Sequence, residues 1–171
     1  MIGICGGLQM LGKTLEDPFL KEGSKGYSEQ KIKGIGLLPI RTTFYESKLS
    51  RQISSESLWP CQSKINGFEI HNGKTELDKS QNFLKIKPIF KDLDLGWYTE
   101  NKEGGTIVGT YIHGIFENDK WRDQYINLIR KSKNLSIFNK RSIPYKIKRE
   151  KIIANLANEF DKHLNITSLL N

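Results

Sequence analysis

A cysteine set between glycines constrains what this chain can fold into more than any other feature. The segment Gly3-x-Cys5-x-Gly7 follows a short apolar stretch typical of a strand end and precedes a helix-like stretch. It has the form of the nucleophile elbow G-x-S-x-G, with sulfur in place of oxygen. In that motif the nucleophile occupies a sharp, strained turn that only small neighbours leave room for. The pattern predicts that Cys5 lies at a strand-to-helix junction.

The position of Cys5 at the start of a helix also favours a reactive thiol. A thiol at a helix N-terminus lies at the positive end of the helix dipole, which favours the thiolate, the nucleophilic form. The backbone N–H of Gly6 would then point toward the oxyanion formed when Cys5 attacks a carbonyl. A buried structural cysteine beside a glycine-rich turn is the alternative, because such cysteines are common.

A thiolate nucleophile needs an imidazole that is near in space and distant in sequence. The chain has three histidines. His113 ends an apolar, β-branched run that begins at Thr106, so its side chain would emerge at the tip of a buried strand, where α/β enzymes place their chemistry. His163 lies in a terminal amphipathic stretch and fits a surface position. A structural role for His113 stays open, but pairing with Cys5 makes it the candidate general base.

Four sequence blocks together resemble the glutamine amidotransferase domain of cobyric acid synthase. Their order and spacing match, and a weaker similarity continues to the end of the chain. The blocks are residues 3–12, 34–39, 67–73 and 109–118.

The resemblance implies an α/β fold of the class I glutamine amidotransferase type, with a doubly wound, flavodoxin-like sheet. It places the amidotransferase domain at residues 1–121, with a C-terminal helical extension at 122–171 packed on it. In this fold several strands precede the elbow, whereas Met1 stands four residues before Cys5. We therefore expect the first strands to be missing, as in a fragment, a split-gene product or a chain with a miscalled start. We also expect little activity from the chain alone.

The function implied by the resemblance is the glutaminase half of a glutamine-dependent amidoligase. Ammonia released from glutamine would pass to an ATP-dependent synthase domain, which would use ATP and Mg to amidate carboxylates of a corrin. The reaction would convert cobyrinic acid a,c-diamide to cobyric acid in cobalamin biosynthesis. Three alternatives stay open: the glutaminase domain of the related a,c-diamide synthase, an unrelated cysteine hydrolase, and a non-catalytic remnant.

By the same resemblance, Cys5 is the thioester-forming nucleophile and His113 is its base. Gln9, on the first turn of the helix, would touch the substrate glutamine. Triad-type glutaminases carry a Glu two positions after the histidine, but Ile115 occupies that position here. The resemblance therefore favours a Cys-His dyad.

Acidic residues do follow His113 at a greater distance. Glu117 and Asp119 are better explained as helix-start residues, because Asn118 or Asp119 can cap the helix that follows.

A second polar pair lies on an expected strand at residues 67–73. Side chains alternate along a strand, so Glu69 and His71 share one face. A second catalytic dyad is conceivable, but a structural or docking role is favoured. This block also fits cobyric acid synthase better than the a,c-diamide synthase.

Hydrophobic periodicity gives a coarse secondary structure. It predicts a helix from Gly6 to about Leu15, a loop at 21–34, and helices at 118–133 and around residues 153–164. It also predicts strands near residues 35–46, 65–71, 83–90 and 106–112, with the polar segment 47–51 as a separator.

Composition excludes several other functions. The net charge of +8 comes mainly from lysines spread along the chain, and the densest basic run, residues 140–151, fits a solvated helix face, so no nucleic-acid partner is expected. No apolar run or leader pattern predicts a membrane span or export. Cys5 and Cys61 lie far apart without metal-ligand neighbours, so neither a metal site nor a disulfide is expected. These features favour a cytoplasmic protein.

Overall fold

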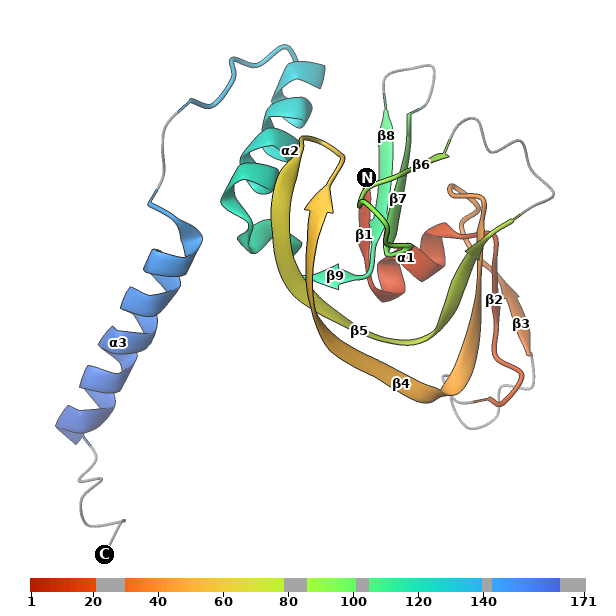
Figure 1. Cartoon of the computed structure of the whole chain (residues 1–171), viewed down its shortest axis with the longest axis horizontal. Helices are drawn as coiled ribbons and strands as arrows, with labels where there is room; N and C mark the ends of the chain where they lie inside the picture. The colour runs from red at the N-terminus through yellow and green to blue at the C-terminus, as the bar shows by residue number, and fades with distance from the viewer. Residues whose placement is uncertain (21–29, 79–85, 101–104, 140–142, 164–171) are drawn as a thin grey trace, which may run out of the picture.

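The computed structural model describes residues 1–20, 30–78, 86–100, 105–139 and 143–163. The fold is mixed α/β, as expected, and within the described residues it comprises two sheets and three α-helices (Figure 1). The two sheets meet around the short helix α1 (Gly6–Leu11), which follows directly on the first strand.

The first sheet has four strands in the order β1-β8-β7-β6. The strand β1 (Ile2–Ile4) runs parallel to β8 (Thr106–Thr110), and Gly3 lies opposite Gly109. The strands β7 (Gly96–Glu100) and β6 (Ile86–Pro88) continue the sheet in antiparallel pairs. The parallel pair therefore brings the N-terminal elbow beside the strand that leads to His113.

The second sheet is built on a long, curved antiparallel pair, β4 (Ile40–Ser57) and β5 (Ser63–Leu77) (Figure 1). Outside β4 lie β2 (Thr14–Glu16) and β3 (Lys31–Lys33), and outside β5 lies β9 (Ile112–His113). The chain thus passes from the first sheet to the second at Tyr111, between β8 and β9.

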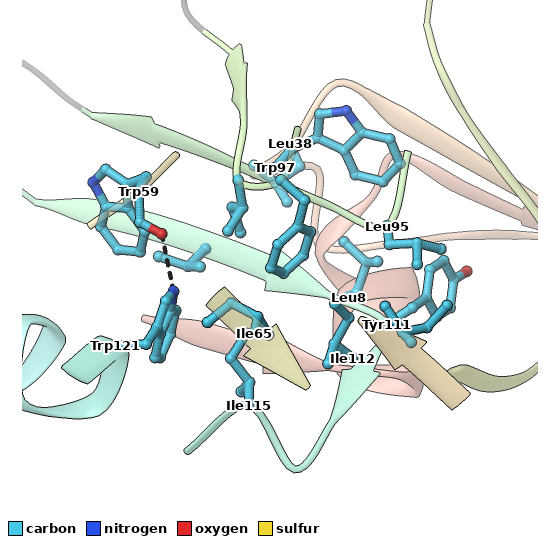
Figure 2. Packing of buried hydrophobic residues seen from close by; sticks show 14 of the residues in the cluster. Leu8, Leu38, Trp59, Ile65, Leu95, Trp97, Tyr111, Ile112, Ile115 and Trp121 are labelled. Carbon is cyan, nitrogen blue, oxygen red and sulfur yellow. Dashed lines mark hydrogen bonds between the residues drawn. The ribbon is translucent and has the colours of Figure 1, made fainter. Parts of the chain in front are cut away.

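One cluster of buried side chains fills the space between these elements (Figure 2). Leu8, Leu38 and Ile112 are fully buried beneath α1 and the sheets. Around Trp121, an aromatic cluster fixes α2 (Asp119–Ser132): the Trp121 indole Nε1–H donates to the carbonyl oxygen of Trp59 at 2.9 Å. Burial of large aromatic side chains holds α2 against the domain.

The helix expected at 118–133 is confirmed by α2, but the side-chain hydrogen bond expected of its cap does not form. Asn118 occupies the N-cap position without a side-chain bond to the helix. Its amide instead bridges to the backbone of Asn66 on β5, donating to one carbonyl and accepting from one N–H, both at 2.9 Å. The residue ties the start of α2 to β5.

The last helix, α3 (Tyr145–His163), differs from the expected extension packed on the domain. None of its residues is buried, and Ile153, Leu156 and Phe160 are exposed. Its first turn is held by the Asp119 carboxylate, which accepts from the Tyr145 N–H at 3.0 Å. No helix in the described ranges combines the length and apolar character needed to cross a membrane.

Other secondary-structure predictions were wrong in particular places. The first helix ends at Leu11 because Gly12 adopts extended backbone, and residues 14–16 form β2 instead. The polar segment 47–51 lies inside β4, and its residues 48–51 pair with residues 69–72 of β5. Within the expected loop, residues 31–33 form β3, and residues 21–29 lie outside the described part.

A buried leucine, Leu38, and an exposed one, Leu156, give a matched test of the packing. Leu38→Ala should lower the free energy of unfolding by about 2–5 kcal/mol, because the deletion leaves a cavity around a fully buried site. Leu156→Ala, on exposed α3, should change it by less than about 0.5 kcal/mol. Urea unfolding followed by tryptophan fluorescence measures both. A large loss in Leu156→Ala would show that α3 is packed after all.

Candidate active site

Cys5 lies on the turn between β1 and α1, as the elbow pattern predicts. Its backbone has φ 53°, a left-handed conformation that non-glycine residues adopt rarely and at a cost. The Cys5 N–H donates to the Thr110 carbonyl at 2.9 Å, which fixes the turn to β8. At Gly3 a Cβ atom would stand 2.5 Å from the Gly7 carbonyl oxygen, so a side chain there would push α1 away.

The structure brings Cys5 and His113 together around a single atom. The Cys5 Sγ donates to the main-chain carbonyl oxygen of Ile70 at 3.3 Å, and the His113 Nε2 lies 3.2 Å from the same oxygen. His113 ends β9 and pairs with Phe68 of β5, while both side chains remain partly exposed. A thiol and an imidazole are thus placed beside each other at a solvent-accessible site.

The other predicted site residues have distinct surroundings. Gly6 is exposed at the start of α1, where the first helical N–H groups have no partner within the helix. Gln9 is buried, and its Nε2 donates to the Asn72 carbonyl and the Tyr111 hydroxyl, each at 3.1 Å. Both amide hydrogens are therefore used within the protein, and a contact between Gln9 and substrate, which stays a prediction, would have to use its carbonyl oxygen.

Tyr111 is a component of the site that the sequence analysis missed. Its hydroxyl hydrogen-bonds to Thr75 as well as Gln9, and Thr75 pairs with Thr42 at 2.6 Å. Burial raises the pKa of the Tyr111 phenol above its usual range, and the hydrogen bonds from Thr75 and Gln9 oppose that rise. Its place two residues before His113 was the only available signal, since a tyrosine in an apolar strand usually packs in a core.

Glu69 and His71 share one face of β5, as the alternation predicts. The His71 Nε2 lies 2.9 Å from Glu69 Oε1, and Arg51 Nε donates to Glu69 Oε2 at 2.6 Å. The His71 ring stacks on Tyr111 with centroids 3.7 Å apart. The pair is joined to the Cys-His site through Tyr111 and through the backbone of β5.

The acidic residues after His113 have other partners in the structure. Glu117 is half-exposed, and its Oε2 lies 4.0 Å from the Arg149 guanidinium. Asp119 accepts from Arg122 and from the start of α3, and these donors hold the pKa of its carboxyl below the usual range despite partial burial. Ile115, at the position of the usual acid, is fully buried.

A cavity of about 890 Å³ opens over the concave face of the β4–β5 pair. Its lining includes Glu69, His71, Trp97 and Tyr111, but neither Cys5 nor His113. The cavity and the Cys-His site are therefore both built on Tyr111 and β5, but the two reactive side chains do not line the cavity.

A cysteine on a strand-to-helix elbow beside a histidine is an arrangement used by enzymes that attack carbonyl carbons with a thiol. Comparison with known proteins narrows this class. The model of the CobB/CobQ-like glutamine amidotransferase domain matches residues 1–121. This chain belongs to that family.

Curated relatives extend the similarity over the whole chain. This chain is 84% identical over 171 residues to a cobyric acid synthase of Prochlorococcus marinus strain AS9601, and the match covers all of this chain and 34% of that relative. The cobyric acid synthase of strain MIT 9312 is 81% identical over the same length, and that of strain NATL1A is 43% identical over 170 residues. The chain thus spans about a third of the length of the relatives it matches.

Replacing Tyr111 tests the buried network. Tyr111→Phe should lower the free energy of unfolding by about 1–3 kcal/mol near neutral pH, since it leaves Gln9 and Thr75 short of a partner. The folded state keeps the phenol protonated, so the stability that depends on it is present below pH about 10 and is lost as pH rises further. The difference between wild type and Tyr111→Phe should therefore shrink above pH 10. Tyr45→Phe, at an exposed position, is the matched control for urea unfolding across this range.

Proposed function

We propose that this chain is the glutaminase portion of a cobyric acid synthase. The placement of Cys5 Sγ and His113 Nε2 around the Ile70 carbonyl oxygen carries the proposal, because it puts the nucleophile of the elbow beside a proton carrier at the end of β9. Family membership and the names of the relatives supply the substrate class.

The proposed chemistry uses this chain's own groups. His113 removes the thiol proton, and Cys5 attacks the side-chain carboxamide carbon of glutamine. The oxyanion forms beside the Gly6 N–H, and the nitrogen leaves as ammonia after receiving the proton from His113. Water then attacks the thioester, with His113 again moving the proton, so glutamate leaves and the thiol is restored.

The later steps belong to a part of the relatives that this chain does not match. There, ATP and Mg would activate a corrin carboxylate, and ammonia would convert it to an amide, taking cobyrinic acid a,c-diamide to cobyric acid. The relatives named cobyric acid synthase support this substrate over that of the a,c-diamide synthase. The competing proposal is that the chain is a non-catalytic remnant, and two measurements distinguish a remnant from a working glutaminase.

Covalent labelling tests the nucleophile. A diazoketone analogue of glutamine should add one equivalent to Cys5, because only this cysteine has the elbow and a histidine near its sulfur. Mass mapping of the labelled chain locates the adduct. Cys61→Ala should label like wild type, whereas Cys5→Ala should not label. In the chain joined to the remaining part of a cobyric acid synthase, an adduct on Cys61, or none on either cysteine, would contradict the proposal.

A histidine replacement separates glutamine hydrolysis from amidation. In the chain joined to an ATP-dependent synthase part, His113→Ala should reduce glutamine-dependent amidation by about a hundred- to ten-thousand-fold. Amidation driven by free ammonia should persist, since ammonia bypasses the thioester. His163→Ala, on exposed α3, is the control and should change neither rate. Equal loss of both activities in His113→Ala would show a structural role.

A further inference from the structure

The main-chain carbonyl oxygen of Ile70 lies within hydrogen-bonding distance of both reactive side chains. We propose that this oxygen orients the substrate: it accepts an N–H of the glutamine carboxamide and thereby selects amides over acids at Cys5. This inference rests on the proposed glutaminase function.

The position of the oxygen follows from where a strand ladder stops. The β5–β9 pairing consists of two residue pairs, and its last is Glu69 with Ile112. The next backbone N–H in register, that of Tyr111, donates instead to the carbonyl of Leu95, the residue just before β7, at 2.8 Å. Ile70 therefore presents its carbonyl to Cys5 and His113 instead of to a neighbouring strand.

The flanking residues hold this carbonyl in place. Glu69 and His71 point to the same side of β5 and are joined at 2.9 Å, and Arg51 ties Glu69 to β4. One residue further along, Gln9 holds the Asn72 carbonyl. The backbone of residues 69–72 is thus fixed by side chains from β4, β5 and α1.

The chemistry of the two ligands explains the selectivity. A carboxamide has two N–H donors on the nitrogen that must leave, and an acceptor beside His113 Nε2 would direct that nitrogen toward the proton it receives. The carboxylate of glutamate has only acceptors, so it would place negative charge against the Ile70 oxygen. Substrate would be oriented and product expelled by the same group.

The sequence offers a selective probe of this carbonyl. The chain contains two Ile-His dipeptides, Ile70-His71 and Ile112-His113. With 13C at isoleucine carbonyls and 15N on histidine, a carbonyl-to-amide NMR correlation gives two signals, and Ile112 serves as an internal control. Cys5→Ala prevents turnover and removes the thiol donor from the Ile70 oxygen.

Glutamine added to labelled Cys5→Ala should move the Ile70 carbonyl signal downfield, as a new hydrogen bond does, and glutamate should not. Cys5→Gly also lacks a side-chain donor and suits the positive φ at this position, so it provides the same test if the alanine variant does not fold. A glutamine-saturated protein whose Ile70 signal stays in place while other amide signals move would overturn the inference. Equal downfield shifts with both ligands would also overturn it. The measurement is made on the chain joined to the unlabelled remaining part of a cobyric acid synthase, and if glutamine moves no signal at all there, the proposed function itself fails.

Discussion

The close approach of α1 to a pair of facing glycines sets the geometry on which the rest of the structure depends. Gly3 of β1 lies opposite Gly109 of β8, and Cβ atoms at these positions would collide with α1. Because glycine has no Cβ atom, Leu8 and Leu11 can pack directly on the backbone of the parallel pair β1–β8. The helix can then begin immediately after Cys5, and the strained φ of that residue is held by the surrounding contacts.

The second consequence of this packing is the path of the chain beyond β8. Tyr111 donates its N–H to Leu95, which leads into β7 of the first sheet, while its hydroxyl and ring contact Thr75 and His71 of β5 in the second sheet. It therefore joins the two sheets at the point where the chain crosses between them. His113 follows after two residues and reaches the elbow, although 107 positions separate Cys5 and His113 in the chain.

Local chemistry made part of this arrangement predictable. Glycine spacing predicted the elbow, because it reports the local backbone. Periodicity predicted the strand before His113, the helix α2 and the shared face of Glu69 and His71, because it reports burial. Residues 47–52 of β4 were missed because both faces of the strand are exposed there, so the sequence shows no alternation. The strand β2 was taken into the first helix since its short pattern fits either period.

The Ile70 carbonyl belongs to a different class of feature, because a backbone atom leaves no trace in residue types. It could not have been identified from sequence, whereas the Cys and His that surround it could. The exposed apolar side chains of α3 show a second limit of prediction from sequence. Periodicity predicts that one face of a helix prefers burial, but it does not predict which surface would cover that face.

The buried carboxylate of Glu69 explains why this part of β5 keeps its shape. Its side chain is 3% exposed, and an uncompensated charge at such a site would cost several kcal/mol. Arg51 and His71 offset that cost only where β4 and β5 keep their register, with Arg51 opposite Glu69. A shift of the strand by one residue would send Glu69 and His71 to the other face and separate the charges. The electrostatics on one side of β5 therefore hold in place the carbonyl that lies between the thiol and the imidazole.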